Sequence, residues 1–426
     1  MKRFFAIAFG LLAAACLADA VTVTGVSACQ RWPWNGLVDV DFNIGGSSVA
    51  DLFKVEVTAV YANGAKKLSA RTYLDEPLVG PGTHRITWDL GADCPGFKAD
   101  DLQVAVTATP ISSAQLDAND VYMVIDLSAG PNATRYPVRY TFTAPTLVPT
   151  NDLVACAADP NRTKKLWLKR VKANVFPFGG TNSNSGEGDF KVSLSAFYIG
   201  IFELTQGQWN LAMGTWPAAF SNETYRAARP VSNINNEEII GHDNWPDNRV
   251  MAEGSYIATM RARTGLATFS LPTEAQWECA SRAGSKQTVQ ISRTTGRCSE
   301  YVSTSGISTY NEGPEVGTTI VGSYKANAWG FYDMFGNVME MCLDAHADIA
   351  DLKTLYGWDD EAQVPVQDPV GPGVNATAKY HATRGGSYGN SAGFCASHRR
   401  DYNCRSETGT KRATIGLRVA VSPEWN

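Results

Sequence analysis

The fold of this chain is decided by one stretch, Asn327-Ala-Trp-Gly-Phe-Tyr-Asp-Met-Phe-Gly-Asn-Val-Met-Glu-Met-Cys342. Three further elements belong with it. They are Leu271-Pro-Thr-Glu-Ala-Gln-Trp-Glu278 upstream, and Arg384-Gly-Gly-Ser-Tyr-Gly-Asn390 and Ile415-Gly-Leu-Arg418 downstream. Beyond residue 284 the sequence predicts mostly loops and short strands, because apolar residues show no sustained helical or strand period there.

The composition is that of a globular protein with apolar cores. The chain has 426 residues, of which 44% are hydrophobic and 19% are charged. Such a length allows two or three domains, and such fractions are not those of a disordered protein. The formal net charge of −5 argues against a general nucleic-acid or anionic-membrane surface, so we expect no nucleic-acid partner.

Residues 1–20 are predicted to be a signal peptide. Two basic residues precede an apolar run over residues 4–17, and Ala18-Asp-Ala20 fits a small-x-small cleavage site. The apolar run is too short to span a bilayer comfortably, and we expect no transmembrane segment. The expected protein is exported: secreted, periplasmic or on the cell surface. Lipid anchoring at Cys16 is the less favoured alternative, because the third position before it is Ala rather than Leu.

Cysteines permit disulfides without dictating them. Cleavage of the signal peptide leaves eight of the nine cysteines, and an even number in an exported protein is compatible with pairing. No spacing selects the pairs, so Cys29–Cys94 and Cys395–Cys404 stand only as guesses. The chain contains no Cys-x-x-Cys and no His spacing typical of a zinc site.

Residues 21–110 predict an all-β domain. Short segments alternate apolar and polar residues, and turn-forming clusters separate them. Short strands at this spacing predict an immunoglobulin-like sandwich. The predicted strands cover residues 21–25, 37–42, 53–60, 83–88 and 102–107.

The segment Gln30-Arg-Trp-Pro-Trp-Asn-Gly36 has two interpretations. Trp32 and Trp34 could stack on a carbohydrate. Alternatively, their rings could fill one end of the sandwich, with Pro33 and Gly36 setting the loop. Packing is the favoured prediction.

The rest of the chain divides into two parts. Residues 111–165 are predicted to be a connecting β segment, because their strand-like runs are apolar enough to need cover. Residues 166–426 are predicted to form a C-terminal domain. Its expected elements are a strand over 191–200 and helices over 203–213, 232–240, 254–264 and 272–283, the last ended by Gly284.

Six collinear elements make residues 166–421 similar to the sulfatase-modifying factor family, whose type member is the formylglycine-generating enzyme. Each element is weak alone, but six in the family's order are specific. The resemblance implies a variant of the C-type lectin fold, so the whole chain is expected to be α+β and loop-rich, with the sandwich first. The six elements are Phe197–Thr205, Arg229–Asn233, Leu271–Glu278, Asn327–Glu340, Arg384–Ser387 and Gly416–Arg418.

The resemblance also implies a calcium site in the segment Asp333 to Glu340. Calcium binds several hard oxygen ligands on an adaptable loop, and Gly336 permits a tight turn between the two carboxylates. By similarity to the family, Asp333 and Glu340 would ligate through side chains, and Gly336 and Val338 through backbone carbonyls. The alternative is that the two carboxylates cap turns or pair with arginine.

The family's enzyme oxidises a cysteine of a target sulfatase with Cu(I) held by two cysteines, which suit this soft ion. Cys395 stands at the second of these positions and Ser387 at the family's serine, so both are candidate catalytic residues. Asn390 stands at the first cysteine position, and its amide cannot replace a thiolate. A copper site rebuilt with Met339 and Met341 is conceivable, but core filling is the favoured interpretation of both methionines.

Residues 387–414 mix small polar, aromatic and charged residues without strand or helix period. This composition is favoured in adaptable binding loops. It also resembles the variable segment of lectin-like binding proteins that retroelements diversify; an ordinary surface loop is the alternative. The candidate ligand-contacting residues are Tyr388, Asn390, Phe394, His398, Asp401, Tyr402 and Asn403.

The sequence therefore leaves two functions. The favoured one is an exported lectin-like module that binds a protein or glycan through residues 387–414. The alternative is a copper-dependent formylglycine-generating oxidase, or a related oxygen-using enzyme, that acts on a sulfatase cysteine. Asn390 favours the first function because the copper-binding pair of thiolates is incomplete.

Overall fold

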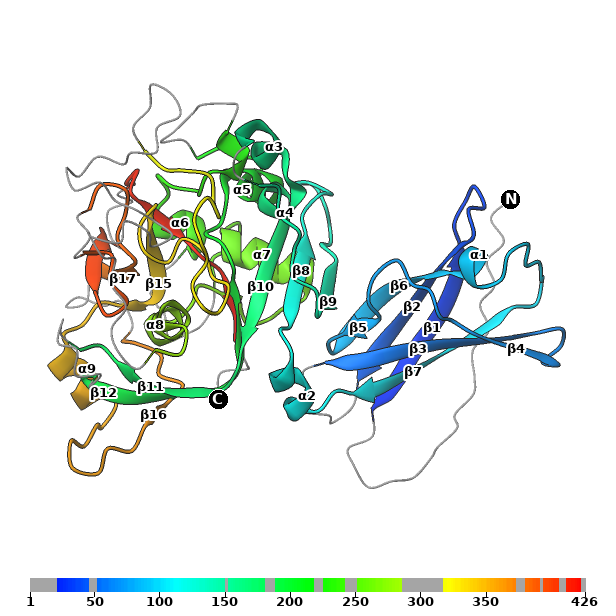
Figure 1. Cartoon of the computed structure of the whole chain (residues 1–426), viewed down its shortest axis with the longest axis horizontal. Coiled ribbons are helices and arrows are strands. Elements are labelled where there is room, and N and C mark those ends of the chain that lie inside the picture. Colours follow the sequence, from blue (N-terminus) through cyan, green and yellow to red (C-terminus); the bar gives the residue numbers. More distant parts are fainter. Residues whose placement is uncertain are drawn as a thin grey trace. The chain divides into compact units, whose positions relative to one another are not determined.

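The computed structural model describes residues 21–45, 52–149, 152–180, 188–217, 225–241, 251–285, 317–372, 380–390, 394–405 and 411–422. The chain forms two compact units (Figure 1). The first comprises residues 1–121 and 139–144, and the second comprises residues 122–138 and 145–426. The structure is mixed α and β, with mostly sheets and short helices, as predicted.

Two antiparallel sheets make up the first unit. In one, β2 lies between β1 and β6, and in the other β3 pairs with β4, β5 and β7. Their bounds, with those of two short helices, are β1 Thr22–Gln30, β2 Leu37–Gly45, β3 Phe53–Tyr61, β4 Lys66–Ser69, β5 Leu78–Val79, β6 Gly82–Asp89, α1 Leu90–Asp93, β7 Gln103–Pro110 and α2 Ser113–Ala118. Residues 139–144 include most of β9 (Val138–Thr141).

The two sheets share one apolar core. Buried residues alternate along β2 and along β3, so each strand presents one face to the core. Val40 from β2, Val55 from β3 and Trp88 from β6 belong to the same buried cluster. The five strands predicted for this part of the chain are confirmed. An immunoglobulin-like topology stays a prediction.

Trp32 and Trp34 do not fill the end of this core. Trp32 is 91% exposed and Trp34 is 42% exposed. The favoured prediction of packing is therefore wrong. Its physical reason is that Trp88 and the alternating residues of β2 and β3 already fill the space between the sheets.

The guessed disulfide between Cys29 and Cys94 is also wrong. Cys29 lies on β1 with its thiol exposed, whereas Cys94 is partly buried and packs against the core, and neither forms a disulfide. Cys395 is buried, and its guessed pairing with Cys404 stays a prediction. The side chain of Cys404 lies outside the described residues.

Within its described residues, the second unit is built from three sheets. One contains β14, β20, β13, β10 and β8 in this order, another β11, β12 and β16, and a third β18, β17, β15 and β19. Their bounds are β8 Tyr122–Asp126, β10 Lys165–Val171, β11 Asn174–Phe178, β12 Phe190–Leu194, β13 Phe197–Gly200, β14 Phe269–Ser270, β15 Met339–Ala345, β16 Val366–Gln367, β17 Tyr380–Arg384, β18 Asp401–Arg405, β19 Ile415–Leu417 and β20 Ala420–Val421. The strand predicted over 191–200 is thus two strands, β12 and β13.

Local sequence explains where the main helices begin. Thr205 starts α5 with a capping box, and Thr273 does the same for α8. Gly214 ends α5 in the left-handed conformation, which glycine adopts without steric cost. The predicted helices are confirmed with later starts. The helical bounds are α3 Leu153–Ala158, α4 Pro160–Thr163, α5 Gln206–Met213, η1 Arg226–Ala228, α6 Asn236–Ile239, α7 Tyr256–Thr264, α8 Glu274–Arg282 and α9 Ile349–Leu355.

Every residue of β15 is buried, which includes two carboxylates, Glu340 and Asp344. The strand lies between β17, which is antiparallel to it, and β19, which is parallel. Burial of a carboxylate is costly unless it is paired or hydrogen-bonded. The partners of these side chains therefore decide how the site is built.

No helix in the described ranges is both long and apolar enough to cross a membrane.

Candidate functional site

Arg418 joins separate parts of the second unit through its buried guanidinium group. It donates from Nε to Oε2 of Glu340 at 2.9 Å and from Nη2 to Oε1 at 2.7 Å. It also donates to the carbonyl oxygens of Gly200 at 2.8 Å and Tyr332 at 2.7 Å. The indole N–H of Trp277 donates to Oε2 of Glu340 at 2.7 Å. The buried charges are thus neutralised in pairs and saturated with hydrogen bonds, as burial requires.

Helix α8 carries a second buried carboxylate, Glu278. It forms ion pairs with Arg384, at the end of β17, and with Arg282, at 2.7 Å. Arg384 also donates from Nη1 to the carbonyl oxygens of Ser397, at 3.1 Å, and Arg399, at 2.8 Å. This carboxylate therefore fixes the arginine that orders the backbone around residues 397–399.

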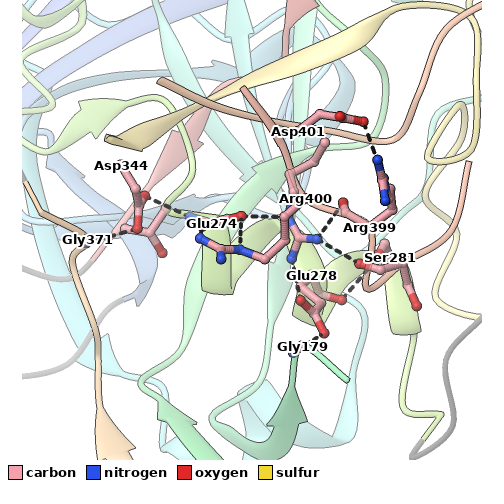
Figure 2. A network of polar contacts seen from close by, with 12 residues as sticks. Gly179, Glu274, Glu278, Ser281, Asp344, Gly371, Arg399, Arg400 and Asp401 are labelled. Carbon is pink, nitrogen blue, oxygen red and sulfur yellow. Dashed lines mark hydrogen bonds and ion pairs between the residues drawn. The ribbon is translucent and has the colours of Figure 1, made fainter. Parts of the chain in front are cut away.

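A third carboxylate, Glu274, binds Arg400 from the same segment. Arg400 donates to the two carboxylate oxygens at 2.7 and 2.8 Å (Figure 2). Burial would raise the pKa of Glu274, but the guanidinium groups of Arg400 and Arg384 hold it below its usual value. The neighbouring Asp344 accepts backbone N–H groups from Glu274, at 2.8 Å, and Gly371, at 2.9 Å. Burial, together with the charge of Glu274, raises the pKa of Asp344 to about 7.

The candidate catalytic residues lie next to this network but do not form a copper site. Oδ1 of Asn390 accepts hydrogen bonds from the backbone N–H of Ser387 at 2.9 Å and from its hydroxyl at 2.8 Å. Cys395 is 0% exposed. Its sulfur packs so closely on the backbone of Gly386 that a Cβ placed there would lie 2.6 Å away. One enclosed thiol and an amide already bound to serine do not fit the two-thiolate donor set that Cu(I) requires.

Met339 and Met341 are both buried within β15. Burial in the central strand of a sheet is the position of a core filler, which was the favoured interpretation. Neither side chain therefore supplies evidence for a rebuilt copper site.

The surface beside Cys395 carries an aromatic and charged cluster. Phe394 is 38% exposed, and the guanidinium carbon of Arg399 lies 4.7 Å from the centre of its ring. Nε of Arg399 also lies 3.7 Å from Oδ2 of Asp401. Sequence reasoning missed Arg399, because a cation–π contact depends on the fold of the loop and not on a motif.

Tyr388 and His398 are half-buried. Burial raises the pKa of Tyr388, and burial together with Arg384 lowers the pKa of His398. Of the predicted ligand-contacting residues, the structure thus describes Tyr388, Asn390, Phe394, His398 and Asp401. The side chains of Tyr402 and Asn403 lie outside the described residues, as do residues 391–393 and 406–410.

The acidic loop forms a separate buried cluster. Oδ2 of Asp333 accepts the backbone N–H of Gly322 at 2.6 Å, whereas Oδ1 is buried with no hydrogen-bond partner in the described part of the chain. Burial is the main reason that the pKa of Asp333 is raised to about 7. Gly336 and Val338 lie in the same buried loop. Glu340 instead uses both oxygens for Arg418, as the alternative of pairing with arginine anticipated.

Glu203 is a member of this cluster that sequence reasoning did not single out. It accepts the side-chain amide of Asn337 at 2.6 Å and the backbone N–H of Val338 at 3.0 Å. Burial raises its pKa, and the charges of Asp333 and Glu340 raise it further. Its place in the element Phe197–Thr205 was the available signal. Across the described residues, no three His, Cys, Asp or Glu side chains are arranged as a metal-binding group.

Replacing Glu278 by Gln should strongly destabilise the second unit. The variant removes the buried carboxylate that Arg384 and Arg282 share and leaves Glu274 as the carboxylate paired with Arg384, a change that costs about 3–5 kcal/mol. Chemical denaturation of the full chain measures this loss. Asp360→Asn is the matched control, because Asp360 pairs with Lys353 at the surface and should leave the midpoint nearly unchanged. Equal midpoints for the two variants would contradict a structural role for Glu278.

The pKa of Asp344 predicts a pH dependence. Between about pH 4 and pH 7 the unfolded chain has lost this proton while the folded chain keeps it, so its contribution to stability falls as pH rises. The loss is about 1.4 kcal/mol per pH unit within that window. Asp344→Asn removes the titration, so the stability of the variant relative to wild type should rise between about pH 4 and pH 7 and level off above that range. A difference between the two proteins that does not change with pH would exclude this assignment.

Comparisons with known proteins identify the family of the second unit. Residues 168–423 match the model of the sulfatase-modifying factor enzyme 1-like domain. The chaperone protein LppX of Paenibacillus barcinonensis is 31% identical over 231 residues, which are 46% of this chain and 77% of that protein. The formylglycine-generating enzyme of Thermomonospora curvata is 30% identical over 159 residues, 36% of this chain and 49% of that enzyme.

One solved structure, Treponema denticola variable protein 1, aligns at 25% identity and a TM-score of 0.43, over 61% of this chain and 96% of that one. The chain thus spans about half the length of the formylglycine-generating enzyme and most of the length of LppX. Since the family model matches more than half of the sequence, this chain belongs to the sulfatase-modifying factor enzyme 1-like domain family.

Proposed function

We propose that this protein is a ligand-binding module built on a formylglycine-generating-enzyme-like domain, and not a formylglycine-generating oxidase. One observation carries the proposal: Asn390, which occupies the position of a copper-binding cysteine, hydrogen-bonds to Ser387, and the remaining Cys395 is fully buried. A thiol with no exposed surface cannot meet a substrate thiol without rearrangement of the loop. The neighbouring amide cannot supply the missing soft ligand.

The ion pairs that Arg384 and Arg400 form with helix α8 support a binding role for the segment 387–414. Arg384 and Arg400 fix its backbone and are themselves neutralised by Glu278 and Glu274. A segment whose backbone is already fixed by these contacts loses little conformational entropy when a ligand binds. Phe394 and Arg399 are the exposed contacts that such a ligand would meet, and an aromatic ring with a guanidinium suits a protein or glycan partner.

The copper experiment separates this proposal from the oxidase. The full chain is loaded with Cu(I) and offered a peptide containing the target cysteine of a sulfatase. Wild type and Cys395→Ser should retain Cu(I) equally and make no formylglycine. Asn390→Cys is the matched gain-of-ligand variant and should retain more Cu(I), because it restores a second thiolate. Formylglycine made by wild type but not by Cys395→Ser would overturn the proposal.

Substitutions on the exposed cluster test binding directly. The full chain is screened on arrays of immobilised glycans and proteins, and the variants are titrated against the bound species. Phe394→Ala should weaken binding about tenfold or more, the loss expected for a central aromatic contact. Arg399→Ala should act in the same direction. Val364→Ala is the control, because Val364 is exposed outside this segment. Binding that neither Phe394→Ala nor Arg399→Ala alters would place the ligand site elsewhere.

A calcium ion at the acidic loop is a second proposal. Oδ1 of Asp333 is a buried oxygen without a hydrogen-bond partner among the described residues, and Glu203 adds a second buried carboxylate nearby. A hard divalent cation would compensate both charges. Asp333, the carbonyls of Gly336 and Val338, and Glu340 are the ligands that the family resemblance implies. Glu340 fits only if it shares an oxygen with Arg418.

Thermal unfolding with chelator and with calcium tests this site. Calcium at about 100 times its dissociation constant should stabilise wild type by about 2.7 kcal/mol. Asp333→Asn should abolish the response, whereas Asp344→Asn, which alters another buried aspartate, should keep it. A response to calcium that survives in Asp333→Asn, or no response in wild type, would contradict the proposal.

A further inference from the structure

The loop between β1 and β2 exposes two tryptophan side chains in the first unit. Trp32 is 91% exposed and Trp34 is 42% exposed. An indole contributes a large apolar surface whose burial is favourable, so two exposed indoles separated by one residue are unusual for a surface without a partner. This loop shares no residue with the segment 387–414, and its role is independent of the binding proposed there.

The exposure of the rings does not come from a loosely held loop. The backbone N–H of Arg31 donates to the carbonyl of Leu37 at 3.1 Å, and the N–H of Leu37 donates to Oδ1 of Asn35 at 3.1 Å. Gly36 is buried, and its carbonyl accepts the N–H of Gly91 at 2.9 Å. A Cβ on Gly36 would lie 2.9 Å from Cα of Gly91, so the contact requires glycine at this position. The loop is thus anchored at its base while its rings face solvent.

Polar residues flank the two tryptophans in the sequence. Arg31 donates from Nε to Asp39 at 3.0 Å and from Nη2 to the hydroxyl of Thr87 at 2.9 Å, which fixes its guanidinium beside the loop. Gln30 and Asn35 are exposed next to the tryptophans and carry amide groups. The surface therefore combines flat apolar rings with hydrogen-bond donors and acceptors at fixed positions.

We propose that residues 30–36 form a binding site for a neutral oligosaccharide. The C–H faces of sugar rings pack on the indole faces of Trp32 and Trp34, and the sugar hydroxyls hydrogen-bond to the amides and to the guanidinium. The two tryptophans are separated by at most about 7 Å of backbone, so both can contact one extended ligand.

The charge of the surrounding residues and the area of the two indoles favour a neutral sugar over an anionic lipid surface or a protein partner. Residues 21–45 contain a single Arg and no Lys, but two Asp, so an anionic lipid surface gains no attraction here. Two indoles bury about 150–250 Å² each, which is well below the roughly 800 Å² per partner of a stable protein interface. A neutral sugar needs neither a charged surface nor a large one.

Retention of the full chain on microcrystalline cellulose, chitin and starch tests the proposal. Wild type should be retained on at least one of these polysaccharides. Trp32→Ala/Trp34→Ala should reduce its affinity about tenfold or more, since each indole contact contributes to binding. Trp216→Ala is the matched control, because Trp216 is 41% exposed in the second unit. Phe394→Ala reports separately on the segment 387–414: loss of retention in Phe394→Ala but not in the double tryptophan variant would assign polysaccharide binding to that segment and contradict this proposal.

Three results would overturn the proposal. They are no retention of wild type on any of the polysaccharides, equal retention of wild type and the double variant, and tryptophan-dependent binding to phosphatidylglycerol vesicles in place of polysaccharide. Thermal unfolding confirms that the variants are folded. If the double variant does not fold, Trp32→Ala alone is decisive, because a side chain that is 91% exposed makes little contribution to the core.

Discussion

The second unit depends on the buried ion pair between Arg418 and Glu340. An isolated buried charge would cost several kcal/mol, and each of these groups is stable there only because the other is present and fully hydrogen-bonded. The pair connects β15 to the segment after β19, and its remaining contacts reach Trp277 on α8 and the carbonyl at the end of β13. One buried ion pair and its hydrogen bonds thus hold together elements that are distant in the sequence.

Buried ion pairs also connect helix α8 to the partly exposed segment that contains Arg399 and Arg400. Glu278 and Glu274 lie one helical turn apart on α8 and bind Arg384 and Arg400. Because the arginines also hold backbone carbonyls, the helix orders a segment that has little regular structure of its own. The motifs shared with the family are therefore largely the partners in buried ion pairs. They specify the fold, whereas position 390, where the family resemblance implies a copper-binding cysteine, is asparagine.

That change has a local physical consequence. A thiolate at position 390 would leave Ser387 available to a bound substrate or metal, whereas the amide of Asn390 accepts both of its hydrogen-bond donors. The turn over residues 387–390 is therefore held by hydrogen bonds between its own residues. These hydrogen bonds and the burial of Cys395 are the two observations on which the proposed binding role rests.

Sequence alone determined the features that depend on neighbours within a few residues. Alternation located the strands of the first unit, and helical spacing of apolar residues located helices such as α5, because both signals act within one or two turns of chain. The collinear motifs identified the family. The residue at position 390 already argued against a two-thiolate copper site.

The tertiary structure decided which buried groups meet. Glu203 lies 134 residues from Asn337, to which it is hydrogen-bonded, and Glu340 lies 78 residues from Arg418, so no local pattern could reveal either pair. It also decided the burial of Cys395 and the exposure of Trp32 and Trp34. Burial depends on how much of the core other strands have already filled, and that is a property of the assembled sheets rather than of any one segment.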